Sequence, residues 1–374
     1  MRRLDISPVD AVFSNGSYPI EFLFYYEEAF KTERLRSGLR RLSSLFWPAL
    51  GEYADGSILF DRYDEAGCYS EESLDQELDI AKLSGAEAAA AARFALPPLE
   101  RLFFLKVSRF RNGLVLVPKL NHLAGDGYSY FLLLSVLAAL TRSNRVPFQS
   151  TVLKRALRVS HKRAVLRGFS FKGVKLDPLP PPGGLTIEQD VMPKGQVEAM
   201  IQETAESAGL RVSANDVLSA LVVKKLAGLG KDRPGGDFDL TMPIDVRGRI
   251  KGYGRGFFGN AIMFHRVTFK REEIENSAVP PLAARIRQLR PGLSAETYLD
   301  FLRRLAEIRA AEKWAEFRPY DPERGCLVTN LSKLPADRLD FGTGPPRLVV
   351  PLTVEKNSAG ILAKGEDFLL RSAF

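Results

Sequence analysis

The stretch that decides the fold is residues 102–127, which read LFFLKVSRFRNGLVLVPKLNHLAGDG. Strand-like runs, 102–109 and 114–120, flank Asn112-Gly113, a pair typical of the type I′ turn because both central residues of that turn need positive φ. The sequence therefore predicts a β-hairpin. Its second strand runs into His122 and Asp126, and an apolar helix over 128–140 follows. At such a junction a side chain can face a cleft from a rigid support.

Outside the hairpin, helix-like and strand-like patterns alternate along the chain. Helix-period apolar faces occur at Leu35/Leu39/Leu42/Phe46, at Leu218/Leu221/Val222 behind a capping Ser213, and at Phe301/Leu305/Ile308, and an alanine-rich helix is expected around 88–92. Further strands are predicted at 57–60, 187–192, 238–242, 260–267, 325–329, 348–354 and 368–370. Interleaved strands and helices favour an α/β fold built in layers.

Length and composition are those of an ordinary globular protein. The 374 residues are enough for two domains or one large one, and a content of 45% hydrophobic and 26% charged residues is typical of a folded globular protein. The richest apolar run, 130–140, is too short to span a membrane, and the start MRRLDISPVD forms no signal peptide, so a cytoplasmic protein is expected. Cys68 and Cys326 stand far apart without a histidine cluster, so neither a disulfide framework nor a metal site is indicated.

The net charge of +8 is concentrated in one segment. Residues 142–175 contain eleven Lys, Arg and His residues and no acid, and the segment ends in LPPPGG at 179–184. We interpret 142–184 as a crossover linker between an N-terminal domain, 1–141, and a C-terminal domain, 185–374. The basic side chains could meet an anionic ligand or an acidic protein surface, or form a solvated surface. No nucleic-acid-binding module accompanies the charge, which disfavours that partner.

His122 and Asp126 form an HxxxDG pattern that is compatible with proton transfer. A neutral imidazole, with an ordinary pKa of about 6.5, can accept a proton from a hydroxyl near neutral pH. Asp126 could orient the imidazole or pair with a basic residue to hold the loop, and the flanking glycines favour the second role. The same pattern also fits a packed histidine followed by a helix-capping aspartate.

Several motifs in one order resemble those of the BAHD acyltransferases, which belong to the chloramphenicol-acetyltransferase-like superfamily. His122-Leu-Ala-Gly-Asp126-Gly127 resembles HxxxDG, and Asp340-Phe-Gly342-Thr343-Gly344 resembles DFGWG. The remaining similar segments are LDISPVD at 4–10, WPALG at 47–51, LTMPIDVRGR at 240–249 and FFGNA at 257–261. Thr343 departs from the family tryptophan, and Asn121 stands where condensation domains have a first histidine.

The resemblance implies two similar α/β domains, each a mixed sheet with helices, with an active-site channel at their interface. In such an enzyme His122 is the general base of a direct attack on the thioester, without an acyl-enzyme. Asp126 pairs with Arg247 in a structural role. Gly127, Asp340, Gly342 and Gly344 shape loops, and Thr329 and Asn260 are candidates for stabilising the oxyanion.

The expected activity is transfer of an acyl group from acyl-CoA, as co-substrate, to a hydroxyl or an amine of a small molecule. In such an enzyme the basic side chains of 142–175 could meet the phosphates of coenzyme A or the acidic face of an acyl carrier protein. No permanently bound cofactor is expected, and a monomer is the expected state. Two alternatives remain open: a condensation-type transferase whose donor is bound to a carrier protein, and a catalytically degenerate binding protein that has kept the channel.

Overall fold

The predicted hairpin is confirmed in the computed structural model of the chain. Strands β7 (Phe103–Phe110) and β8 (Gly113–Asn121) are antiparallel, with Phe110 opposite Gly113. The predicted turn type is wrong, because the two loop residues are Arg111 and Asn112 and neither has a positive φ. The Asn112 side chain stabilises the turn instead, since it bonds both the N–H and the C=O of Leu78 at 2.9 Å.

The structure describes residues 1–16, 19–84, 93–97, 101–143, 171–178, 184–229, 236–290 and 292–374. Within them the helices are α1 (Pro8–Ala11), α2 (Thr32–Leu45), α3 (Ile80–Ser84), α5 (Gly127–Ser143), α7 (Lys194–Ala208), α8 (Ala214–Leu229), α9 (Arg271–Asn276), α10 (Val279–Leu289) and α11 (Ala295–Ala310). Short 3₁₀ turns occur at Val12–Ser14, Trp314–Glu316 and Ala336–Arg338.

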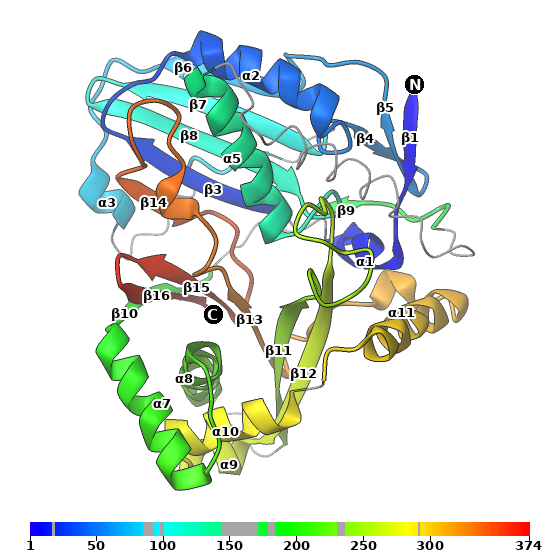
Figure 1. Ribbon diagram of the computed structural model, residues 1–374, viewed down its shortest axis with the longest axis vertical. Helices are drawn as coiled ribbons and strands as arrows, with labels where there is room; N and C mark the ends of the chain where they lie inside the picture. The colour runs from blue at the N-terminus through cyan, green and yellow to red at the C-terminus, as the bar shows by residue number, and fades with distance from the viewer. Residues whose placement is uncertain are drawn as a thin grey trace.

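The hairpin forms the centre of a five-stranded sheet in the N-terminal half, ordered β14-β3-β8-β7-β6. The other strands are β3 (Pro19–Tyr26), β6 (Tyr69–Ser73) and β14 (Leu348–Pro351), and only β6 and β7 are parallel in it. Helices α2 and α5 cover one face (Figure 1). Leu78, Leu83 and Phe94 cover the other face, so the central strands are buried on both sides.

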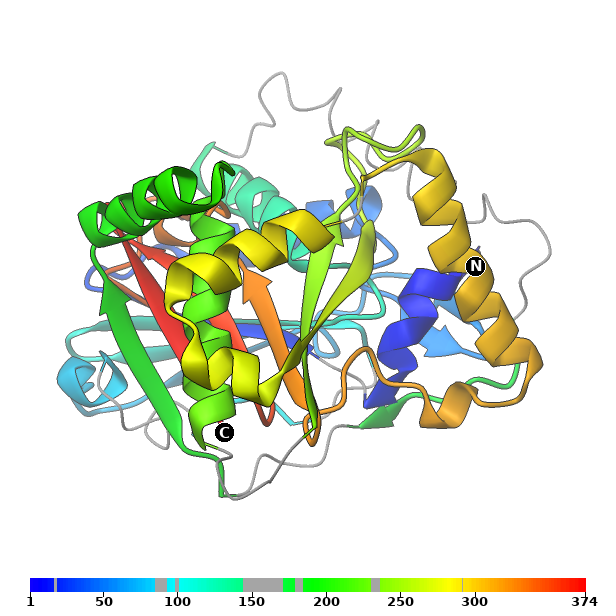
Figure 2. The same cartoon turned by 90° about the horizontal axis from the view of Figure 1, so that it is seen from below.

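A six-stranded mixed sheet forms the C-terminal half. Its order is β10 (Ile187–Met192), β16 (Asp367–Ala373), β15 (Ser358–Lys364), β13 (Gly325–Asn330), β11 (Asp237–Asp245) and β12 (Ile262–Lys270). Strand β13 is parallel to both of its neighbours, and the other pairs are antiparallel. Helices α7, α8 and α10 pack on one face (Figure 2). The opposite face is turned toward the N-terminal half (Figure 1).

The two halves exchange elements. Strand β14 comes from the C-terminal half of the sequence but pairs with β3, with Val349 opposite Phe24. Helix α11 likewise buries Tyr298, Leu302 and Leu305 in the core that contains α2 and α5. The division into 1–141 and 185–374 stays a prediction, and of the linker 142–184 the structure describes only 142–143, 171–178 and 184.

Most predicted elements are confirmed in the described residues. The apolar faces lie on α2, α8 and α11, and the seven further strands correspond to β5 (Ser57–Phe60), β10, β11, β12, β13, β14 and β16. At the start of α8 the carboxylate of Asp216 accepts hydrogen bonds from the backbone N–H and from the hydroxyl of Ser213, both at 2.8 Å, so Asp216 and not the Ser213 hydroxyl satisfies a backbone donor there. The predicted helix at 88–92 lies outside the described residues. Two small sheets complete the fold: β1 (Arg2–Asp5) and β4 (Glu52–Ala54) flank β5, and β2 (Asn15–Gly16) pairs with β9 (Asp177–Pro178).

The cysteines and the helices bear on two expectations from the sequence, a lack of disulfides and a lack of membrane spans. Both cysteines are buried and unpaired. None of the helices in the described ranges has the length and apolar character that crossing a membrane requires.

Candidate active site

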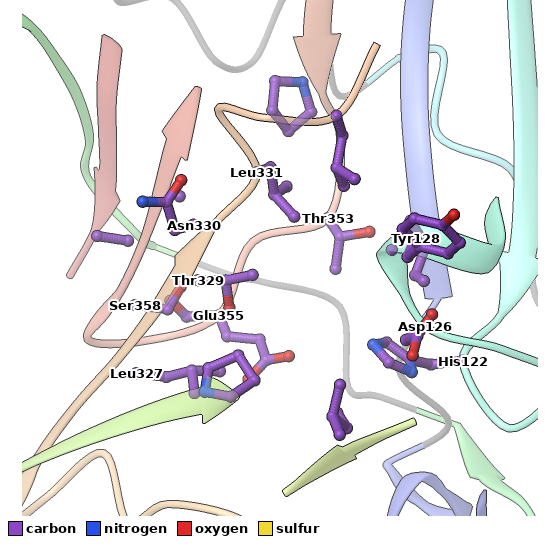
Figure 3. Close-up of a pocket in the computed structure, with 18 of the residues that line it drawn as sticks. His122, Asp126, Tyr128, Leu327, Thr329, Asn330, Leu331, Thr353, Glu355 and Ser358 are labelled. Carbon is purple, nitrogen blue, oxygen red and sulfur yellow. The ribbon is translucent and has the colours of Figure 1, made fainter. Parts of the chain in front are cut away.

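A cavity of about 540 Å³ lies between the two sheets, a size typical of small-molecule sites. From the N-terminal half it is lined by Phe13, the start of β3, His122 and the first residues of α5. The C-terminal half contributes residues of β11, β12, β13, β15 and β16 and of the loop 351–355. In Figure 3, His122, Asp126 and Tyr128 face Thr329 and Glu355 across the cavity.

His122 follows the last residue of β8 and lines the cavity. One face of the imidazole stacks on Phe13, with ring centroids 3.6 Å apart and an interplanar angle of 16°. The Nδ1 atom lies 3.2 Å from Oδ1 of Asn260. The ring is therefore held on one face and at one nitrogen.

Asn260 lies two residues before β12 and is buried next to the imidazole of His122. Its Nδ2 donates to Oδ1 of Asp10 and to the carbonyl of His122, both at 2.8 Å. Its amide hydrogens are thereby engaged with acceptors, and its Oδ1 is the atom that faces the imidazole. Asn260 is not among the described residues that line the cavity.

Burial lowers the pKa of His122 to about 4, because removing the ring from water disfavours the charged form. The charges of Asp126 and Asp10 and the contact with Asn260 act in the opposite direction but are smaller effects. The imidazole is therefore neutral near pH 7 and has a free lone pair on one nitrogen.

Asp126 and Arg247 form a buried ion pair between the two halves. The guanidinium donates from Nη1 to Oδ2 at 2.8 Å and from Nη2 to Oδ1 at 2.9 Å. Asp126 also accepts from the backbone N–H of Ser129 at 3.0 Å and of Ala261 at 2.9 Å. Burial by itself raises the pKa of Asp126, but Arg247 and these hydrogen bonds outweigh it and lower the pKa below its usual value.

Arg247 also bonds the segment 257–259 of the C-terminal half. Its Nε donates to the carbonyl of Phe257 at 3.1 Å, and its Nη2 donates to that of Gly259 at 2.8 Å. Gly125 allows the loop to pack closely on the start of α5, because a Cβ there would lie only 2.8 Å from the Cβ of Ser129. The HxxxDG loop is thus joined directly to the C-terminal half.

The DFGTG loop lies away from the cavity, against the N-terminal sheet. Oδ1 of Asp340 accepts the backbone N–H of Gly342 at 2.7 Å and of Gly344 at 3.0 Å, and both glycines have positive φ. Phe341 stacks on Phe30 with centroids 5.2 Å apart. Arg142 donates to the Asp340 carbonyl. These contacts determine the shape of the loop and do not bring Asp340 to the histidine.

The cavity contains some of the predicted residues and several that the sequence did not indicate. His122, Asp126, Gly127, Arg247 and Thr329 line it, whereas Asn260, Asp340, Gly342 and Gly344 do not. Phe13, Glu355 and Arg371 also line it and were missed. No periodicity marks such residues, because they meet only after the sheets pack. Asp10 lies in a quoted motif, but its contact with Asn260 depends on tertiary structure.

A histidine-lined cavity between two mixed sheets defines a two-domain protein of the chloramphenicol-acetyltransferase-like fold. The Transferase family model matches residues 89–367, more than half of the chain. The chain belongs to this family, the BAHD acyltransferases.

Relatives and solved structures agree with this family. Acyl transferase 9 of Oryza sativa subsp. japonica is 22% identical over 308 residues, which are 82% of this chain and 69% of the relative. Acyl transferase 7 of the same plant is 29% identical over 157 residues, 41% of this chain, and the match spans only 34% of that relative.

Two solved structures share the fold over the whole chain. F. graminearum TRI101, complexed with coenzyme A and deoxynivalenol, has a TM-score of 0.77 at 15% identity, with 100% of this chain and 95% of that one covered. Vinorine synthase has a TM-score of 0.77 at 16% identity, with 100% and 90% covered. At these identities the likeness shows the fold.

Proposed function

We propose that the protein transfers an acyl group from acyl-CoA to a hydroxyl, or to an amine, of a small molecule, with His122 as general base. The observation that carries the proposal is the neutral imidazole of His122 at a cavity wall between the two halves. The TRI101 structure contains coenzyme A together with a small molecule, which supports a CoA thioester as co-substrate here.

The contacts of Asn260 support Nε2 of His122 as the basic nitrogen. Nδ2 of Asn260 faces a carboxylate and a carbonyl, so the NH₂ group belongs on that side and the oxygen faces Nδ1. Nδ1 then carries the hydrogen that Oδ1 accepts. The lone pair of His122 therefore lies on Nε2. We propose that Asn260 positions the base, in place of the oxyanion role expected from the sequence.

Direct attack fits the surroundings of the histidine. In the described part of the chain no serine, threonine or cysteine side chain bonds to the imidazole, so no activated protein nucleophile accompanies it. The acceptor O–H or N–H gives its proton to Nε2 while its heteroatom forms a bond to the thioester carbonyl carbon. When the tetrahedral intermediate collapses, the C–S bond breaks and the CoA thiolate takes the proton from the imidazolium.

Thr329 and the Asp126–Arg247 pair have supporting roles in this proposal. Thr329 lines the cavity opposite His122, and its hydroxyl is a donor candidate for the oxyanion (Figure 3). The ion pair joins the loop that carries His122 to the C-terminal half and maintains the distance between the base and that wall.

The test is acceptor-dependent thiol release from a panel of acyl-CoA donors, each combined with alcohols and with amines. We expect thiol release together with an ester or amide product, and an unchanged protein mass after mixing with the donor alone. An acylated protein would contradict direct attack. Activity only with carrier-bound donors would favour the condensation-type alternative. Absence of activity with both acyl-CoA and carrier-bound donors would favour the degenerate binding protein.

A further inference from the structure

Arg371, on strand β16, is a buried cation in the cavity wall. It is only 7% exposed, and it lines the cavity. Within the described ranges its guanidinium forms no hydrogen bond or ion pair, and its Nε is a buried donor without an acceptor. Buried charges in proteins are almost always paired, so this residue requires an explanation.

The sheet register places Arg371 in the same row as Thr329. Thr329 pairs with Gly360 on β15, and Gly360 pairs with Arg371 on β16. Residues paired in this way project from the same face, and neighbouring strands lie about 4.8 Å apart. The three residues therefore form one row across the face of the sheet that lines the cavity.

Gly360 leaves a gap in the middle of this row. A Cβ at position 360 would meet only Cδ1 of Leu362, at 3.9 Å, so the space above the glycine is open. Small groups entering from the side of Thr329 can reach Arg371 through this gap. The opening and the cation belong to the same part of the cavity wall.

The other charged residues of the cavity wall are accounted for. Glu21 lies 3.7 Å from Lys119, and Glu355 accepts a hydrogen bond from Tyr320 at 3.0 Å. Asp126, Arg247 and Asp245 form one cluster, and Lys333 is partly exposed. Among the described residues of this wall, Arg371 is the buried charge that lacks a partner.

We propose that Arg371 is a specificity-determining residue that binds a carboxylate carried by one of the two substrates. The inference rests on the proposed function and deepens it. A guanidinium donates two parallel hydrogen bonds to a carboxylate, and one cation balances the single negative charge of that group. Burial lowers the pKa of Arg371 to about 10, so the side chain remains a cation at pH 7.

The carboxylate has two possible carriers, and a kinetic experiment distinguishes them. In the donor arm, succinyl-CoA is compared with acetyl-CoA at a neutral acceptor. In the acceptor arm, 4-hydroxybenzoate is compared with its methyl ester at acetyl-CoA. We expect wild type to prefer the carboxylate form in one arm, and Arg371→Met to lose that preference by about 10- to 100-fold in kcat/KM.

A binding experiment separates this inference from the proposed function. In the inactive background His122→Ala, thermal stabilisation by succinyl-CoA and by 4-hydroxybenzoate is compared with and without Arg371→Met. We expect one of these probes to stabilise the protein only when Arg371 is present. The matched control Arg338→Met, at an arginine whose side chain is 80% exposed outside the cavity, should leave that stabilisation unchanged.

A structural role for Arg371 would give a different result. Because the guanidinium is buried and unpaired, Arg371→Met should unfold at the same or a higher denaturant concentration than wild type. Lower stability of the variant would overturn the inference. It would also be overturned by equal carboxylate preference in both proteins, or by carboxylate probes that bind wild type no better than Arg371→Met.

Discussion

Replacing Asp126 with asparagine tests the ion pair between the halves, because it removes one charge and keeps the shape of the side chain. Each carboxylate oxygen accepts two hydrogen bonds, one from Arg247 and one from a backbone N–H. The amide has one oxygen and one NH₂ group, so one pair of donors faces another donor. The guanidinium of Arg247 also loses its buried counterion.

The expected cost follows from the burial of this pair. The side chains of Arg247 and Asp126 are 3% and 5% exposed. Breaking a buried pair by removing one partner costs about 3–5 kcal/mol, because an uncompensated charge stays inside. Asp245 also contacts Arg247, at 3.1 Å, but its side chain is 50% exposed. Asp245→Asn is therefore the matched control, with an expected cost of about 1 kcal/mol or less.

Denaturant unfolding measures these costs, and a double-mutant cycle isolates the pair. We expect Asp126→Asn to lose about 3–5 kcal/mol of unfolding free energy. In Asp126→Ala/Arg247→Met, the combined loss should be smaller than the sum of the single losses, because no unpaired charge remains. Equal costs for Asp126→Asn and Asp245→Asn, or additive losses in the cycle, would refute the assignment of this pair.

Three further predictions concern the surroundings of the base. With a His122 pKa of about 4, kcat/KM should stay constant as the pH falls from 8 to 5 and decrease only as it approaches 4; a midpoint near 6.5 in a pH-rate profile would contradict this. Asn260→Ala should lower kcat by at least about tenfold at similar KM, because the tautomer of the base is no longer selected; unchanged kcat would exclude that role. Burial raises the pKa of Glu355 from 4.5 to about 7, so wild-type stability should fall as the pH rises from about 4.5 to 7, and Glu355→Gln should remove this dependence in denaturation at several pH values.

The sequence predicts those features of the fold that depend on residues close together in the chain. The hairpin and the helix after His122 depend on neighbouring residues, and both are present. The predicted type I′ turn failed because the side chain of Asn112 bonds the distant Leu78. That contact has no signal within the turn itself.

Among the strands that the sequence did not predict, β3 and β15 were missed for physical reasons. β3, PIEFLFYY, is buried on both faces, so it lacks the alternation that marks a half-exposed strand. β15, SAGILAK, is poor in the β-branched and aromatic residues that favour strands. Both are central to the site, since the start of β3 and the first residues of β15 line the cavity.

The candidate site was predictable only in part. The family motifs directed attention to His122, Asp126 and Arg247, and the structure brings these residues together. The placement of Asn260 behind the imidazole could not be predicted, because it depends on Asp10 and on the carbonyl of His122. Arg371 has no sequence signal, since its significance is the lack of a partner after folding.

The most direct measurement is acceptor-dependent thiol release by His122→Ala beside wild type, with His265→Gln as the matched control. His265 lies on β12 and outside the cavity lining, so its variant should turn over like wild type. Loss of the general base should lower turnover by about 10²- to 10⁴-fold. Turnover by His122→Ala equal to that of wild type would contradict the assignment of this imidazole as the base.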